Sequence, residues 1–229
     1  MVKTPISTFP KAISGLIAVF LGFLSFSANA QINVKAGYSF SLVHDDAIDQ
    51  LVDEVNQAND YEHNFKNLRW VHGFDVGLRF KSGPHALELS YLGGYRHLLG
   101  TNPNPGGGSD IKDKLIFDTE SFGLGYQLSD DHFGLGAELQ YQFYYTKAKL
   151  TLPEMNFRDV QEIWATKLYL MLILEGSGSV TAVIEPYYIL PTKGYNAQPI
   201  QEFMEVSLQP SQNKWTRFGL SFLFYNGFQ

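Results

Sequence analysis

The stretch His132-Phe-Gly-Leu-Gly-Ala-Glu-Leu-Gln-Tyr-Gln-Phe-Tyr-Tyr-Thr146 alternates apolar and polar side chains for longer than a soluble strand usually runs. Because a β-strand sends successive side chains to opposite faces, the odd-numbered residues from Phe133 to Tyr145 share an apolar face. The even-numbered residues, among them Gly134, Glu138 and Gln142, share a polar face. One face therefore suits lipid, as in a transmembrane β-barrel, where backbone polar groups are paired within a closed sheet.

Seven other stretches alternate in the same way and complete a set of eight candidate strands. The eight candidate strands are residues 31–43, 70–81, 85–98, 115–128, 132–146, 164–174, 180–190 and 215–228. Pro186 lacks an N–H group for the ladder, so it predicts a β-bulge in the seventh strand. Asp118 and Glu120 occupy the apolar parity of the fourth strand, so its beginning is expected to stand clear of the bilayer.

The connections between these strands alternate strictly between short and long. Residues 81–84, 129–131 and 175–178 read as tight turns, and residues 44–69, 100–114, 149–163 and 191–214 as long loops. This is the arrangement of outer-membrane barrels, which have short periplasmic turns and long outside loops. The sequence thus predicts an all-β fold, an eight-stranded antiparallel transmembrane up-and-down β-barrel over residues 31–229. A short helix is expected in the first long loop, where Ile48, Leu51, Val52 and Val55 recur at helical spacing.

Residues 1–30 have the pattern of a secretory signal peptide. Lys3 and Lys11 precede an apolar run, and Ala28-Asn29-Ala30 supplies a small-residue cleavage site. The chain contains no cysteine, so no disulfide is expected in the oxidising envelope. Removing the two signal-peptide lysines changes the formal net charge from −6 to −8, which disfavours nucleic acid as a partner.

The alternation alone does not distinguish a membrane barrel from a soluble lipocalin-type barrel with its apolar face inside. Glycine does distinguish them, because glycine makes room where side chains crowd and weakens an exposed strand without gain. The charged face carries nine glycines, which marks it as the cramped interior of a small barrel. These are Gly37, Gly73, Gly77, Gly94, Gly123, Gly125, Gly134, Gly136 and Gly219.

The chain ends in the aromatic-rich stretch Phe218-Gly-Leu-Ser-Phe-Leu-Phe-Tyr-Asn-Gly-Phe-Gln229. With the signal peptide and the eight strands, it resembles the small outer-membrane β-barrel families, the OmpA-like and PorT-like proteins. The resemblance implies an outer-membrane location, contact with outer-membrane lipid and lipopolysaccharide, and a final strand that the barrel-assembly machinery reads. The residues it assigns to that terminal assembly strand are Phe218, Leu220, Phe222, Phe224 and Phe228. Phe228 is penultimate, a slight departure from families that end on the aromatic.

Three tryptophans begin strands that follow long loops. Trp70, Trp164 and Trp215 are therefore expected at the outer membrane–water interface, where tryptophan is favoured. Trp215 has the wrong parity relative to Phe218, so either a local irregularity intervenes or its ring points inward.

The inward charges have the clearest expected role. Register counted from the turns places Glu88 diagonal to Arg79 and Asp75, and Glu185 diagonal to Lys167. Buried charges persist only when they are paired, so a mixed-sign set predicts a network that plugs the lumen. The expected members of this lumen charge network are Lys35, Asp75, Arg79, Glu88, Arg96, Glu138, Lys167, Glu185 and Arg217.

No catalytic or metal-binding set converges by spacing. The lipid A deacylase type, by resemblance, has His-x-Ser on a lipid-facing strand, but His72-Gly73-Phe74 lacks the serine. His72 is expected to face Gly93 between Tyr91 and Tyr95, within an aromatic belt. The acidic residues of the first loop lack the order of a calcium loop, and no cofactor is expected.

Two functional classes remain open, with a third behind them. The first is a non-enzymatic envelope protein that acts in integrity, in assembly or secretion support, or in binding an extracellular or envelope partner through its loops. The second is a lipid A-modifying enzyme with an unrecognised site, and the third is a narrow, porin-like pore.

Overall fold

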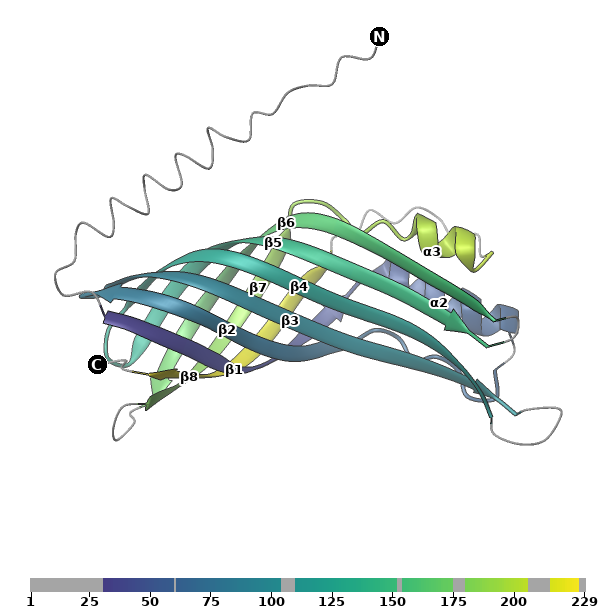
Figure 1. Cartoon of the computed structure of the whole chain (residues 1–229), viewed down its shortest axis with the longest axis horizontal. Coiled ribbons are helices and arrows are strands. Elements are labelled where there is room, and N and C mark those ends of the chain that lie inside the picture. The colour runs from purple at the N-terminus through teal and green to yellow at the C-terminus, as the bar shows by residue number, and fades with distance from the viewer. Residues whose placement is uncertain are drawn as a thin grey trace, which may run out of the picture.

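The computed structural model describes residues 31–59, 61–103, 110–151, 154–174, 180–205 and 215–226. Eight antiparallel strands form a closed barrel in which each strand pairs with its sequence neighbour and β1 pairs with β8 (Figure 1). This confirms the predicted eight-stranded up-and-down barrel. The predicted signal peptide, the turn at 175–178 and Phe228 lie outside the described residues.

The eight strands differ in length. Their bounds are β1 Gln31–His44, β2 Trp70–Ser82, β3 His85–Asn102, β4 Ile111–Ser129, β5 Phe133–Leu150, β6 Met155–Leu174, β7 Val180–Pro191 and β8 Thr216–Asn226. Two helices lie in the long connections, α2 at Asp46–Asn59 and α3 at Gln198–Phe203. Within the described part of the chain, neither helix has the length and apolar character needed to cross a membrane.

The outer surface of the barrel carries an apolar belt. Large hydrophobic side chains on the outward parity of every strand are exposed, for example Leu42 on β1, Phe74 on β2, Leu135 on β5 and Phe218 on β8. The opposite parity is buried in this part of the barrel and carries charged and polar side chains together with an apolar cluster mainly on β6, β7 and β8. Charges inside and apolar side chains outside are the arrangement of a barrel surrounded by lipid.

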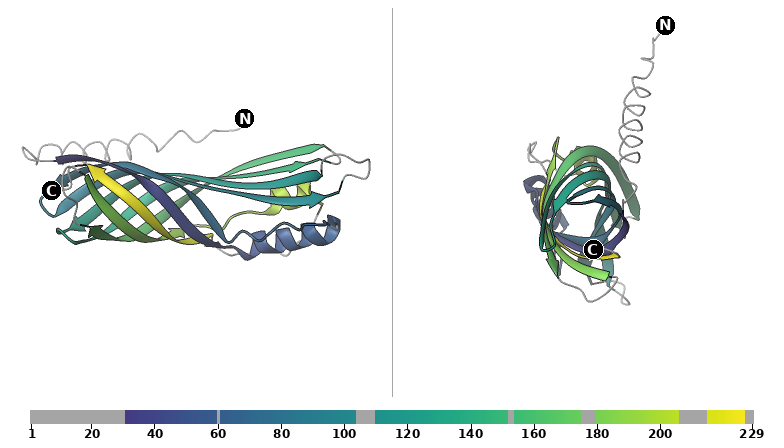
Figure 2. Two further views of the ribbon diagram at one scale, coloured as in Figure 1. Left: turned by 90° about the horizontal axis from the view of Figure 1, so that it is seen from below. Right: turned by 90° about the vertical axis from the view of Figure 1, so that its left-hand side faces the viewer.

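β3, β4, β5 and β6 continue well past the ends of the other four strands and form an extension of the barrel wall (Figure 2, left). Residues 100–114 and 149–163 were expected to be long loops, and this expectation was wrong at both ends of the first range and for most of the second, because residues 100–102, 111–114, 149–150 and 155–163 belong to strands. Lys112 already pairs with Thr101, and Arg158 with Lys147. The strands continue beyond the apolar belt with polar outward residues. A search for strands with apolar outward residues therefore reads these ends as loops.

Polarity reverses in this extension. On β4, Leu115 and Phe117 point inward and are fully buried, while Lys114 and Asp118 point outward. On β5, Tyr144 and Ala148 are likewise fully buried. The extension is therefore a sheet with an apolar inner face and a polar outer face, as in a water-soluble protein.

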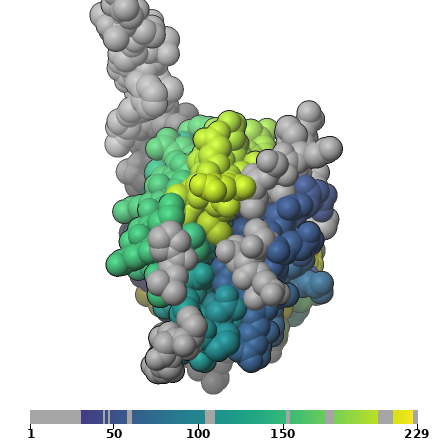
Figure 3. All heavy atoms as spheres, turned by 90° about the vertical axis from the view of Figure 1, so that its right-hand side faces the viewer, coloured from purple at the N-terminus to yellow at the C-terminus, as the bar shows by residue number. Residues whose placement is uncertain are grey.

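Helix α2 covers the apolar inner face of the extension. The predicted helical positions Ile48, Leu51, Val52 and Val55 are all fully buried, which confirms the amphipathic reading of this loop. Asp45 precedes the helix, and its Oδ1 accepts the backbone N–H of Ile48 at 3.3 Å, as an N-cap does. Figure 3 views the molecule from the end that carries the extension, where α2 and α3 lie at the surface.

A tight turn sets the register of β2 and β3 at the other end of the barrel. Gly83 adopts φ +58° between the paired residues Ser82 and His85, a backbone conformation that favours glycine. Pro186 was expected to mark a bulge, and this was wrong. Its pairing with Leu220 on β8 keeps the register of its neighbours, so β7 accommodates the missing N–H without an extra residue.

Candidate functional site

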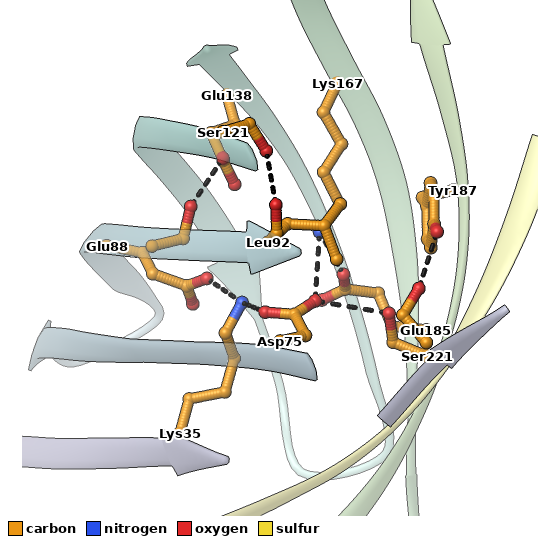
Figure 4. A network of polar contacts seen from close by, with 12 residues as sticks. Lys35, Asp75, Glu88, Leu92, Ser121, Glu138, Lys167, Glu185, Tyr187 and Ser221 are labelled. Carbon is orange, nitrogen blue, oxygen red and sulfur yellow. Dashed lines mark hydrogen bonds and ion pairs between the residues drawn. The ribbon is translucent and has the colours of Figure 1, made fainter. Parts of the chain in front are cut away.

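The lumen at the level of the apolar belt is closed by charged side chains that meet in its centre. Nζ of Lys35 lies 2.7 Å from Oδ1 of Asp75 and 2.5 Å from Oε1 of Glu88. Nζ of Lys167 lies 2.7 Å from Oε1 of Glu185 and 3.5 Å from Oδ2 of Asp75. All five side chains are buried. Asp75 thus joins two lysines that reach it from different walls of the barrel (Figure 4).

Neutral groups complete the coordination of these carboxylates. Oγ of Ser221 donates to Oδ2 of Asp75 at 3.2 Å, and the Tyr225 hydroxyl donates to Oε2 of Glu88 at 3.3 Å. Gln127 Nε2 also donates to Oε2 of Glu88. A buried charge is tolerable when both partners and additional hydrogen bonds surround it, so this arrangement can persist in a dry lumen.

The expected neighbour of Arg79 was Glu88, and the structure places Arg79 differently. Arg79 and Glu88 are direct cross-strand partners, but Glu88 binds Lys35 instead. Nη2 of Arg79 donates to Oγ of Ser129 at 2.8 Å, and the guanidinium lies 5.4 Å from the ring centroid of Tyr225. The sequence could not show this, because the long first connection gives no register for β1 and hence no position for Lys35.

Two further expected members, Glu138 and Arg217, lie inside the barrel but bind polar side chains. Oε1 of Glu138 accepts Ser90 Oγ at 2.5 Å and Gln140 Nε2 at 2.8 Å. Nη1 of Arg217 donates to Oγ1 of Thr119 at 2.9 Å. These two charges therefore lie beside the lysine–carboxylate network and are linked to the wall by neutral groups.

Arg96 lies outside the lumen network, in contrast to the expectation. It stands opposite the start of β2, and its guanidinium stacks on the exposed ring of Trp70 at 4.3 Å from the centroid. The position is on the inward parity, but pairing with β2 ends nearby, which gives a long side chain a way out between the strands.

Glycine clears the space that the buried side chains occupy. A Cβ on Gly123 would lie 1.7 Å from Oε1 of Glu138, and one on Gly219 would lie 2.1 Å from the ring of Tyr187. The predicted use of glycine on the inward face is thus visible in the packing of this lumen.

The tryptophans divide between two environments. Trp70 and Trp164 point outward with exposed fractions of 38% and 50%. Trp215 was expected at the interface, but its ring is 1% exposed and packs against Tyr144 at 4.4 Å between centroids, inside the extension. The parity mismatch with Phe218 has this cause: the strand is regular, and the ring points inward.

His72 lies in a cluster of aromatic rings on the outer surface. Its Nδ1 bonds the Tyr38 hydroxyl, and its ring lies 5.3 Å from that of Trp70. His72 pairs with Tyr95, so the expected pairing with Gly93 was two residues out of register. The two-residue turn at Gly83 accounts for the difference. Among the residues that the structure describes, no cluster of three or more His, Asp or Glu side chains could hold a metal ion.

The outward residues of the terminal strand form part of the apolar belt. Phe218, Phe222 and Phe224 are exposed, and Leu220 shares their parity. Their proposed recognition by an assembly machinery stays a prediction.

One surface was not anticipated from the sequence. The outward face of the extension carries five cations on three neighbouring strands, and we refer to it as the cationic face. Its members are Lys112 and Lys114 on β4, Lys147 and Lys149 on β5, and Arg158 on β6. Lys114 pairs directly with Lys149, and Lys147 with Arg158. The signal in the sequence is Lys-x-Lys on one parity, which occurs in both β4 and β5.

The closed eight-stranded barrel with an apolar belt and a polar interior defines the class of small outer-membrane β-barrels. Two solved structures with this fold are those of Ail, the attachment invasion locus protein of Yersinia pestis. One, in complex with the heparin analogue sucrose octasulfate, has a TM-score of 0.52 and 12% identity over 86% of this chain and 97% of Ail. The other has a TM-score of 0.50, with 12% identity over 85% of this chain and 95% of that one.

Neisserial surface protein A (NspA) is a more distant neighbour. It has a TM-score of 0.40 and 9% identity, over 87% of this chain and 99% of NspA. No family model and no curated protein sequence matches the chain.

Proposed function

We propose that this protein is a non-enzymatic outer-membrane barrel that presents its extension outside the cell and binds sulfated polyanions on the cationic face. The observation that carries the proposal is the cationic face itself. Lys112, Lys114, Lys149 and Arg158 form no ion pair with any described residue, in a chain whose formal net charge is −6. Cations are thus concentrated on one surface of an acidic protein.

The arrangement is unfavourable without a ligand. Like charges directly opposite each other on neighbouring strands destabilise a sheet, and two such pairs occur here, Lys114 with Lys149 and Lys147 with Arg158. Among the described residues, Lys147 alone of these five cations has a counter-charge, Oδ2 of Asp118 at 3.0 Å. A polyanion lying across β4, β5 and β6 would neutralise several cations at once and release its counterions, which is the source of affinity in such complexes.

The barrel itself would anchor this surface in the membrane. The apolar belt suits a bilayer, and the ion network fills the lumen where a pore would run. Residues 1–30 as an export signal, Phe218 to Phe228 as an assembly signal and contact with lipopolysaccharide belong to the same proposal. Because His72 bonds Tyr38 within a cluster of rings, its geometry favours a place in the aromatic belt over a catalytic role.

The complex of Ail with a sulfated heparin analogue is a precedent for anion binding by a barrel of this fold. The argument for this chain rests on its own five cations, since the likeness to Ail is one of fold.

Heparin chromatography of the mature protein in a non-ionic detergent tests the proposal. We expect retention at physiological salt and a clear shift to lower salt for the double variant Lys114→Gln/Lys149→Gln, because each lost contact lowers the salt dependence by about one charge. Lys193→Gln removes an exposed cation after β7 and is the control, with an expected elution unchanged from wild type.

Non-sulfated hyaluronan in place of heparin tests the class of ligand. Weak retention there supports recognition of sulfate density. Failure of the wild type to bind heparin, or an equal shift for Lys193→Gln, would refute the proposal.

A further inference from the structure

Two adjoining hollows lie at the outer end of the apolar belt and share one residue, Trp70. The first has a volume of about 310 Å³ and runs along the outward face of β1 and β8. The second has a volume of about 440 Å³ and lies where the segment before β2 meets β3. One hollow is apolar and the other is cationic, so together they are complementary to a molecule with an apolar chain and an anionic headgroup.

The first hollow is walled by side chains that face lipid. Phe40, Leu42, Phe218 and Leu220 line it, with Ser41 and Gly219 beneath them. The register explains the grouping: Leu42 pairs with Trp70 on one side and with Phe218 on the other, and Phe40 pairs with Leu220. A chain of methylene groups lying here would contact apolar side chains from both neighbouring strands.

The second hollow is lined by three cations and no carboxylate. Lys66, Arg69 and Arg96 line it, together with Asn67 and Trp70. The backbone fixes its position, because the carbonyl oxygen of Arg69 accepts the N–H of Val43 at 2.9 Å. Stacking on Trp70 fixes the guanidinium of Arg96.

These cations lack the partners that would normally balance them. None of Lys66, Arg69 and Arg96 forms an ion pair within the described part of the chain, and Nε of Arg96 is buried without a hydrogen-bond partner. Three cations around one hollow repel one another unless an anion lies between them. A phosphate group matches this need, because guanidinium groups bind its oxygens in a fixed fork and lysine adds a point charge.

We propose that the two hollows together bind one phosphorylated membrane amphiphile, with its phosphate among Lys66, Arg69 and Arg96 and an acyl chain between Phe40, Leu42 and Phe218. Trp70 lies at the junction of headgroup and chain, which is the level in a bilayer where tryptophan is favoured. Phosphorylated glycolipid and phospholipid share this chemistry. For the glycolipid, the site rests on the proposed contact with lipopolysaccharide. It is separate from the cationic face, so its failure would leave the proposed polyanion binding untouched.

Native mass spectrometry of the mature protein from maltoside micelles, which contain no phosphate, tests this site. The probes are lipid A with its phosphates, the same lipid dephosphorylated, phosphatidylglycerol and inorganic phosphate. We expect one phosphorylated lipid to be retained per barrel, and retention to fall at least fivefold for Lys66→Gln/Arg69→Gln. Lys193→Gln removes an exposed cation that belongs to neither surface and is the control, with retention expected to match the wild type.

The other probes distinguish a phosphorylated glycolipid from a phospholipid, and further variants test the apolar and the cationic hollow separately. Tighter retention of lipid A than of phosphatidylglycerol assigns the glycolipid, and the reverse assigns the phospholipid. Leu42→Ser is expected to weaken lipid retention without changing the yield of folded barrel. Equal retention of dephosphorylated lipid, equal retention by Lys66→Gln/Arg69→Gln, or binding of inorganic phosphate as tight as that of lipid would overturn the proposal.

Discussion

Lys167 and Asp75 stand on opposite walls of the barrel, on β6 and β2, yet Nζ of the lysine lies 3.5 Å from Oδ2 of the aspartate. A contact between opposite strands spans the whole lumen. Lys35 approaches the other oxygen of the same carboxylate at 2.7 Å, so Asp75 is held from two directions. The charged side chains of the interior therefore connect opposite walls of the barrel as well as fill its lumen.

Replacing Asp75 by alanine is expected to destabilise the barrel by about 3–5 kcal/mol, because Lys35 and Lys167 lose the carboxylate between them while still buried. The midpoint of the heat-induced gel shift and of urea unfolding measures this. Ser221→Ala is the control, since it removes one neutral hydrogen bond to the same carboxylate and should cost only about 1 kcal/mol. Equal losses in the two variants would contradict a charge-based brace.

The same contacts predict an electrically silent barrel. An eight-stranded barrel is only just wide enough for its own side chains, and here they meet across it. Planar-bilayer recordings of the wild type should show no steady conductance. Large, long-lived ohmic openings would refute the closed lumen and promote a channel function.

Gly123→Ala is expected to cost about 1–3 kcal/mol, because its Cβ would lie 1.7 Å from Oε1 of the buried Glu138 side chain and overpack the lumen. Gly125→Ala is the matched control on the same strand and face, since its Cβ would meet its nearest atom at 3.4 Å. Unfolding of both variants in urea gives the comparison. If the two lose equal stability, strand propensity and not lumen space accounts for the glycine.

Leu51→Ala should loosen α2 while leaving the barrel folded. Leu51 is fully buried in the apolar core of the extension, so its truncation should cost about 2–5 kcal/mol locally. Limited proteolysis of residues 44–69, read alongside the heat-induced gel shift, separates the two effects. Glu54→Ala, on the exposed side of the same helix, should leave the cleavage rate unchanged.

Tyr61 is expected to make the stability of the same region fall at high pH. Burial and a hydrogen bond from its hydroxyl to Oδ2 of Asp113 at 2.8 Å raise the pKa of Tyr61 above its ordinary value. The folded loop therefore holds the phenol proton more tightly than the unfolded chain does. The stabilising effect is complete below pH about 10 and is lost as the pH rises above it.

Hydrogen exchange of residues 61–68 across this pH range measures the effect. Wild-type protection should fall above pH about 10, and Tyr61→Phe should show a flatter dependence with lower protection at neutral pH. Identical alkaline profiles would show that Tyr61 does not control this segment.

The sequence-based prediction was most accurate for the part of the barrel that carries the apolar belt. The bounds of β1 and β2 lie within one residue of the expected ranges, because most outward residues there are apolar and each connection is distinct. The helix at Ile48 to Val55 was predicted for a similar reason, since its apolar spacing excludes a strand. Where the outer side of a strand or helix faces a single environment along its whole length, the spacing of its apolar residues identifies it in the sequence.

The errors occurred where the surroundings change or where register spans a long connection. The outer parts of β4 and β6 read as loops because their outward residues face water. Lys35 was placed in the lumen, but its partner was not predictable, since residues 45–69 separate β1 from β2. Arg96 turned outward because the neighbouring strand ends there, which no periodicity reveals.

The reversal of polarity along β4 and β5 also fixes how deep the molecule sits. On the outward face of β4, Asp118 and Glu120 give way to Phe122, and on β5, Lys147 gives way to Phe143 and the residues below it. A rise of two residues, roughly 7 Å along a strand, would lift Phe122 into water. An equal descent would drag Asp118 toward hydrocarbon. The barrel is therefore held at one height in its bilayer, and that height keeps the extension clear of the lipid surface.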